Sequence, residues 1–298
     1  MTLEIPETDL ATRYNISPFF QPGLKIVRRV IDDERPFIFV IDRSLSMGSV
    51  LTAGSTKRRW DELIERLEGT FDLLTHFPGF VAEVYLFHEH LMTVTKPEHV
   101  VDLIATLRIT TLTPGTPLCQ TLTKLFANHP RGNFIICSDG EATDDRSYKA
   151  HDYYSSDMYR ILYHKPSSVF ISWWLCSNEE DFIRYLSFLD EKILNMDLVD
   201  DFQSEVFRCG KTPLTLGSYY VKSLAAPFLP WMDDVDSGTI GNFELPPDYE
   251  TSIVNRPHKT SNEVPHTVSH GVSHGVRQTT LVNRAPRVVQ DDRCCIIL

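Results

Sequence analysis

The stretch that decides the fold is FIFVIDRSLSMGS, residues 37–49, in which five apolar residues are followed directly by short side chains that carry oxygen. An apolar run of this length, bounded by polar residues, is typical of a strand covered on both faces in a parallel sheet. Such a strand delivers the residues that follow it to the edge of the sheet. Asp42, Ser44 and Ser46 are therefore candidate members of a binding site at that edge.

The segments beyond this strand alternate between apolar runs and helical patterns. Further strands are expected at 81–87, 91–95, 134–137, 169–175 and 197–199. Apolar residues recurring every three or four positions predict helices at 60–74, 97–107, 118–126, 178–189 and 212–226. Alternation of this kind predicts an α/β fold: a doubly wound, Rossmann-like, mostly parallel central sheet with helices on both faces.

The character of the sequence changes at both ends of this region. Residues 1–34 are a mixed lead-in for which the pattern predicts no defined structure, and 35–230 form the expected domain. Residues 231–293 are rich in Pro, Ser, Thr, Asn and His. A segment of this kind cannot bury enough apolar surface to offset its ordering entropy, so a disordered tail is expected there.

Composition excludes some classes of protein. The formal net charge is -11, and no cluster of Lys and Arg suggests a nucleic-acid binder. The six cysteines form no CxxC pair, and three of the four internal ones lie in or beside apolar runs, as expected of reduced thiols in a cytosolic protein. No secretory signal is apparent, and no apolar run approaches the roughly 20 residues of a membrane span.

Three segments are expected to meet at one edge of the sheet, because ligands of open parallel sheets bind outside the carboxyl ends of the strands. The first carries Asp42, Ser44 and Ser46, the second carries Thr116 in TPGTP, and the third carries Asp139 in SDGE. Two carboxylates and three hydroxyls are hard oxygen donors. They suit Mg²⁺ better than zinc, which prefers nitrogen and sulfur.

These residues resemble the metal-ion-dependent adhesion site of von Willebrand factor type A (VWA) domains. Asp42, Ser44 and Ser46 match the DxSxS element of that family, Thr116 matches the threonine of its GTP loop, and Asp139 matches the aspartate of its TDG loop. The resemblance covers about residues 35–226. The three elements occur in the family's order, each after the expected structural unit.

The resemblance implies a function. In the family the serine hydroxyls usually bind the metal directly and the aspartates often act through water, so the metal keeps positive charge and attracts a carboxylate. The implied partner is a protein that presents Glu or Asp, and the implied cofactor is Mg²⁺, with Mn²⁺ or Ca²⁺ as alternatives. The start of a helix at Thr116 is expected to favour the incoming anion further. Leu45 replaces a common glycine and Ser138 a common threonine, but neither change removes a ligand.

Other interpretations stay open at this stage. The same cluster could belong to a metal-dependent hydrolase of phosphate esters, with His88 or His90 brought to the metal as a base, or to a structural adaptor with an empty metal site. No nucleophile is visibly paired with a base, so an enzyme is not expected. Taken singly, Thr116 could be a helix cap and the other site residues turn formers, while Asp144 and Asp145 are expected to form a solvated loop.

The last residues predict a lipid anchor. Cys295 followed by Ile, Ile and Leu fits a prenylation box, and the terminal Leu298 favours geranylgeranyl. Cys294 is a candidate for palmitoylation, which would supply the second anchor that stable membrane binding needs. The expected location is the cytoplasmic side of a membrane in a eukaryotic cell or host. The sequence does not indicate an oligomeric state.

Overall fold

The computed structural model describes residues 5–51, 56–140, 142–145, 153–177, 179–209 and 212–229. The chain divides into two units, 1–254 and 255–298, and all described residues belong to the first. The tail predicted to be disordered and the two cysteines predicted to carry lipid lie outside the described residues. No described helix has both the length and the apolar character needed to cross a membrane.

A six-stranded sheet with the order β3-β2-β1-β4-β5-β6 forms the centre of the domain. Every neighbouring pair is parallel except β2 and β3, which form a hairpin. The strands are β1 (Phe37–Ile41), β2 (Ala82–Leu86), β3 (Glu89–Val94), β4 (Gly132–Ser138), β5 (Val169–Leu175) and β6 (Met196–Val199). The order runs outward from β1 in both directions, which confirms the predicted doubly wound fold.

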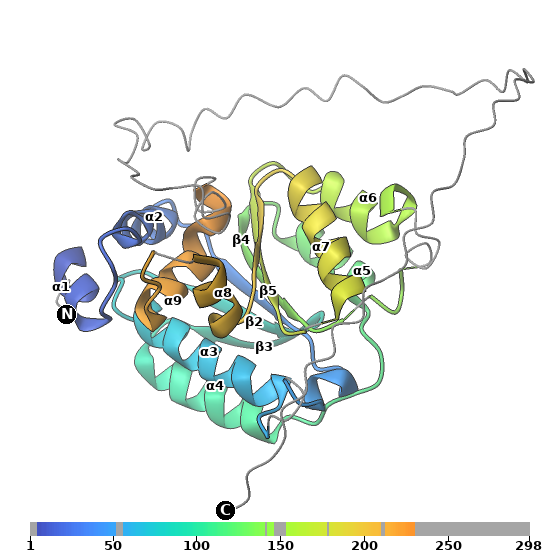
Figure 1. Ribbon diagram of the computed structural model, residues 1–298, viewed down its shortest axis with the longest axis horizontal. Coiled ribbons are helices and arrows are strands. Elements are labelled where there is room, and N and C mark those ends of the chain that lie inside the picture. Colours follow the sequence, from blue (N-terminus) through green and yellow to red (C-terminus); the bar gives the residue numbers. More distant parts are fainter. Residues whose placement is uncertain are drawn as a thin grey trace, which may run out of the picture. The chain divides into compact units, whose positions relative to one another are not determined.

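Helices cover both faces of this sheet (Figure 1). One core lies under α1, α2, α3, α4 and α9, and a second lies under α5, α6 and α7. The helices are α1 (Glu7–Arg13), α2 (Gln21–Asp32), α3 (Arg59–Leu74), α4 (Pro97–Ile109), α5 (Leu118–Asn128), α6 (Asp157–Tyr163), α7 (Glu180–Lys192), α8 (Phe202–Cys209) and α9 (Leu216–Ala225). Short 3₁₀ turns occupy Leu45–Gly48, Tyr153–Ser155 and Ala226–Phe228.

The continuous apolar run of β1 is explained by the two cores. Phe37, Phe39 and Ile41 belong to the first core, whereas Ile38 and Val40 belong to the second. All five side chains are fully buried. Successive residues of a strand point to opposite faces, so a strand between two helical layers must be apolar at every position.

The lead-in differs from the expectation of undefined structure, because residues 5–34 contain α1 and α2. Leu24 and Val27 of α2 are buried in the same core as Val221 of α9. The backbone N–H of Ser17 also donates to Ser218 Oγ at 2.9 Å. The N-terminal helices are therefore part of the domain.

Several local expectations need correction. The last helix was predicted from 212, but α9 begins at Leu216 after Thr215, whose hydroxyl accepts the backbone N–H of Ser218. The helix α8 was not predicted. The turn of the β2–β3 hairpin lies at 87–88, and β3 begins at Glu89, two residues before the expected strand at 91–95. Asn178, the predicted start of α7, lies outside the described residues, and α7 begins at Glu180.

The expected burial of the internal thiols is confirmed. Cys119, Cys137, Cys176 and Cys209 are buried, free cysteines. Cys137 ends the apolar part of β4, and burial raises the pKa of its thiol well above its usual range. These thiols contribute to the core as small apolar side chains.

Candidate metal site at the ends of the central strands

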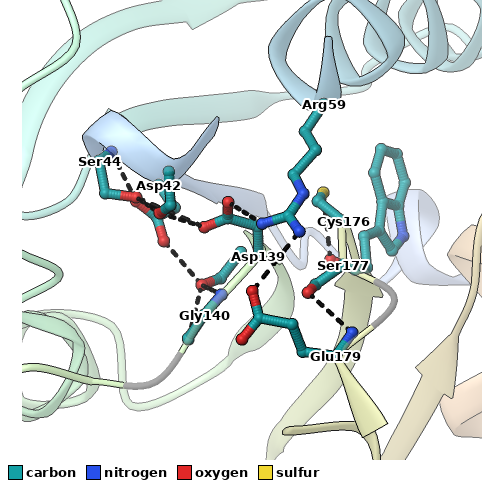
Figure 2. Close-up of polar contacts among 11 residues, drawn as sticks. Asp42, Ser44, Arg59, Asp139, Gly140, Cys176, Ser177 and Glu179 are labelled. Carbon is teal, nitrogen blue, oxygen red and sulfur yellow. Dashed lines mark hydrogen bonds and ion pairs between the residues drawn. The ribbon is translucent and has the colours of Figure 1, made fainter. Parts of the chain in front are cut away.

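The parallel pairing of β1 and β4 brings the first and third predicted segments together. Ile41 lies beside Cys137 in the register, so the residues that follow each strand emerge at the same edge. The backbone N–H of Asp42 continues the pairing by donating to the Cys137 carbonyl at 2.9 Å. Figure 2 shows Asp42, Ser44 and Asp139 close together at this edge.

Three side-chain oxygens form a compact triangle there. The hydroxyl oxygens of Ser44 and Ser46 are 2.8 Å apart. Ser46 Oγ donates to Asp139 Oδ1 at 2.8 Å, and Ser44 Oγ lies 3.4 Å from the same oxygen. Neighbouring ligands on an octahedral Mg²⁺ with bonds of about 2.1 Å lie about 3.0 Å apart. The three oxygens therefore have the spacing of one face of a metal octahedron, and the donor set fits a hard divalent cation.

Asp42 lies deeper than this triangle and holds the loop that carries the serines. Its Oδ1 accepts the backbone N–H of Ser44 at 2.7 Å, and its Oδ2 accepts the hydroxyl of Ser138 at 2.7 Å. Burial raises the pKa of Asp42 to about 6, the hydrogen bonds from Ser44 and Ser138 oppose that rise, and nearby Asp139 adds to it. A bound cation would favour the ionised form. The serine in place of the family's threonine at 138 thus still donates to Asp42.

Thr116 reaches the same edge on a neighbouring loop. Thr113 pairs with Ser44 in a short parallel bridge, and its backbone N–H donates to the Arg43 carbonyl at 2.8 Å. Thr116 is buried, and its backbone exchanges two hydrogen bonds with Thr143. Across the described ranges its hydroxyl makes no hydrogen bond to the other four predicted ligands. The structure therefore joins four of the five predicted residues directly and places Thr116 on the adjacent loop.

Thr116 is not the cap of the following helix, contrary to the alternative interpretation. The helix α5 begins at Leu118, and its first free N–H groups are taken by Asp144. The carboxylate of Asp144 accepts the backbone N–H groups of Cys119 at 3.1 Å and Gln120 at 2.8 Å. The positive end of α5 is thus already met by an anion, so the extra attraction expected for a partner's carboxylate is reduced.

The expectation of a solvated loop at 144–145 is therefore wrong. Asp145 is half-buried, and its two oxygens accept the backbone N–H groups of Asp157 at 3.0 Å and Met158 at 3.1 Å at the start of α6. Both aspartates act as helix caps supplied from a distant loop. Capping of this kind satisfies N–H groups that have no partner within the helix.

Arg59, the first residue of α3, also belongs to the site and was not expected there from the sequence. Its Nη1 donates to Asp139 Oδ2 at 2.7 Å, and its Nη2 lies 3.5 Å from Glu179 Oε1 (Figure 2). The Arg59 side chain is only 11% exposed and that of Asp139 is fully buried. One signal was available: Lys57, Arg58 and Arg59 place three positive charges at the start of a helix, where cations are disfavoured.

The histidines considered for a hydrolase lie on the β2–β3 hairpin. His90 Nε2 is 3.2 Å from Thr93 Oγ1, and its ring packs edge-on against Tyr85. His88 is exposed at the turn. Among the residues that the structure describes, no group of three or more His, Cys, Asp and Glu side chains could hold a metal ion by itself. The candidate site consequently depends on its serine hydroxyls.

Comparisons with known proteins found distant structural likenesses and no match in sequence. No protein-family model matches the chain, and no curated protein matches it in sequence. The structure is similar to the SpRpn10 VWA domain (TM-score 0.40, 7% identity), over 62% of this chain and 93% of that one. It is also similar to the manganese-loaded Plasmodium vivax TRAP protein (TM-score 0.39, 11% identity), over 57% of this chain and 70% of that one.

A further similar structure is the PilB minor pilin from Streptococcus sanguinis (TM-score 0.42, 10% identity), matched over 68% of this chain and 62% of that one. All these likenesses are distant, so the site is assigned from the residues of this chain alone. Its fold and contacts define a doubly wound α/β protein with an oxygen-lined candidate metal site at the ends of β1 and β4.

Proposed function

We propose that this protein is a VWA-type protein-interaction module that binds an acidic residue of its partner through a divalent cation, with Mg²⁺ as the first candidate and Mn²⁺ or Ca²⁺ as alternatives. The observation that carries the proposal is the triangle of Ser44 Oγ, Ser46 Oγ and Asp139 Oδ1, with sides of 2.8, 2.8 and 3.4 Å. When bound there, the cation would supply an open coordination position for the partner's carboxylate.

Each residue of the site has a distinct role in this proposal. The hydroxyls of Ser44 and Ser46 are neutral ligands, so they would leave most of the positive charge available to the partner. Asp139 would share its Oδ1 with the cation or with a water molecule on it. Asp42 positions the serine loop through the N–H of Ser44. Thr116 on the neighbouring loop is proposed as a further oxygen ligand.

The surroundings suggest what the partner presents beside its acid. Leu45, between the two serines, is 58% exposed, and Val50 at the end of the same loop is also exposed. Apolar surface beside a binding site can be buried by an apolar residue of the partner. The fitting partner segment therefore carries an apolar residue next to Glu or Asp.

The proposal includes a membrane tether. Cys295 would carry a geranylgeranyl group and Cys294 a palmitoyl group, and residues 231–293 would link the anchor to the domain. Intact-mass spectrometry of protein from eukaryotic cells tests this part. The expected mass shows one geranylgeranyl group and loss of the last three residues, whereas an unmodified full-length mass would contradict it.

Calorimetric titration of the full chain with Mg²⁺ and Mn²⁺ tests the metal site. Ser46 is exposed, so Ser46→Ala should leave the fold intact and weaken metal binding about tenfold or more. Ser49→Ala, three residues further on and also exposed, is the matched control and should bind normally. Absence of binding by the unmodified chain would overturn the proposal in favour of an adaptor with an empty site. Turnover of a phosphate ester that is lost in Asp139→Asn would instead favour a hydrolase.

A further inference from the structure

We propose that Arg59 is a built-in competitor of the metal at Asp139 and that Glu179 is the alternative partner that receives Arg59 when the metal binds. This inference rests on the proposed function, because it concerns the same site. It assigns to Arg59 and Glu179 control over how tightly the site holds a divalent cation. Neither residue is one of the five metal ligands predicted from the sequence.

The two oxygens of the Asp139 carboxylate contact different groups. Its Oδ1 faces the hydroxyls of Ser44 and Ser46, and its Oδ2 accepts Nη1 of Arg59 at 2.7 Å. A cation beside the serines and the guanidinium would therefore share one fully buried carboxylate. Two positive groups this close repel strongly where water screens them little. Metal binding is consequently weakened as long as Arg59 stays on Asp139.

The placement of Arg59 has no local explanation. A cation in the first turn of a helix is opposed by the positive end of that helix. Its neighbours Lys57 and Arg58 meet Glu65 and Asp61 of the same helix, at 2.6 and 2.8 Å. Arg59 instead turns inward to a carboxylate 80 residues further along the chain. A residue that breaks a local rule in order to reach a site is a candidate for a functional role.

Glu179 offers Arg59 a second partner. Its Oε1 is 3.5 Å from Nη2 of Arg59, which is longer than a direct hydrogen bond, and its side chain is 66% exposed. The backbone N–H of Glu179 donates to Ser177 Oγ at 3.2 Å, which fixes the start of α7 while leaving the carboxylate free to approach. The guanidinium can therefore shift from Asp139 to Glu179 and stay paired. Such a shift would free Asp139 Oδ2 and move a positive charge away from the metal.

Calorimetric titration of the full chain with Mg²⁺ tests the competition. Arg59→Gln removes the charge, and the expected result is Mg²⁺ binding about tenfold tighter or more, on the scale of a charge-assisted hydrogen bond. Arg58→Gln is the matched control, because it removes an adjacent, exposed charge that is paired with Asp61 in the first turn of α3, and it should leave the affinity unchanged. An affinity of Arg59→Gln equal to or weaker than that of the unmodified chain would overturn the inference.

A second variant decides the matter if Arg59→Gln fails to fold. Glu179→Gln alters an exposed side chain and leaves Arg59 with Asp139 alone, so Mg²⁺ should bind about threefold weaker or more. Unchanged affinity in Glu179→Gln would then refute the exchange. If the unmodified chain and both variants bind neither Mg²⁺ nor Mn²⁺, the proposed function itself fails. If the unmodified chain binds and the variants match it, only the role of Arg59 fails.

Discussion

Two buried ion pairs of this domain differ in their surroundings. Lys222 of α9 meets Glu205 of α8, both side chains are almost fully buried, and Glu205 also accepts the backbone N–H of Asp200 at 2.8 Å. Arg59 meets Asp139 at the edge of the sheet, beside two serine hydroxyls and an exposed second carboxylate. The enclosed pair fixes two helices to each other. In the edge pair, the serine hydroxyls lie beside Asp139 and the second carboxylate lies beside Arg59. Each member of this pair therefore has another group to contact if the ion pair separates.

The largest predicted effect concerns the enclosed pair. Lys222→Met leaves the carboxylate of Glu205 buried without its cation, which should lower the free energy of unfolding by about 3–5 kcal/mol. Urea unfolding followed by circular dichroism measures this loss. The double variant Lys222→Met, Glu205→Met should recover part of it, because an apolar pair has no unpaired charge, while the backbone N–H of Asp200 loses its acceptor. A loss below about 1 kcal/mol would show that the pair is not enclosed as described.

A second prediction concerns how stability depends on pH through Asp200, which lies next to the enclosed pair. Burial raises the pKa of Asp200 to about 6, while Arg208, 2.8 Å away, opposes the rise. The ordinary pKa of an aspartate is about 3.9, so between pH 4 and 6 the folded chain binds a proton that the unfolded chain has released. Asp200 should therefore make stability fall as pH rises through this window, by at most about 3 kcal/mol.

The matching variant for this prediction is Asp200→Asn, which cannot titrate. Its free energy of unfolding, measured by urea at pH 4 and pH 7, should fall less, or rise more, from pH 4 to pH 7 than that of the unmodified chain. The difference between the two slopes isolates Asp200 from the other carboxyl groups. Identical slopes would contradict a raised pKa at this position.

A smaller effect is predicted on the site side, at the cap of α5. Asp144→Ala removes the acceptor of two backbone N–H groups and should lower the free energy of unfolding by about 1–2 kcal/mol. Asp102→Ala, an exposed aspartate within α4, is the control and should change stability by less than about 0.5 kcal/mol. Thermal unfolding resolves this difference. Equal effects of the two variants would restore the solvated-loop interpretation.

Much of the fold follows from local sequence pattern. The uninterrupted apolar run of β1 indicated a strand between two helical layers, and Pro97 correctly marked the start of α4. The order of the strands also explains why residues as far apart as Ser44 and Asp139 could be expected to meet. These inferences succeeded because hydrophobic period and the geometry of parallel sheets determine them.

The parts that could not be predicted depend on contacts between distant residues. Nothing near Asp144 in the sequence shows that it caps a helix that begins before it in the chain, and a polar, acidic stretch looks like a solvated loop. In the same way, local sequence does not show which of three adjacent cations turns inward, as Arg59 does. The helices α1 and α2 lacked a clear signal because their burial depends on α9, about 200 residues away.

The most direct test of the central claim is a crystal structure of the protein grown with Mn²⁺, with anomalous diffraction used to locate the metal. We predict one anomalous peak within roughly 2.0–2.6 Å of the hydroxyl oxygens of Ser44 and Ser46, with the guanidinium of Arg59 on Glu179. A well-ordered site without such a peak at saturating Mn²⁺ would contradict the account.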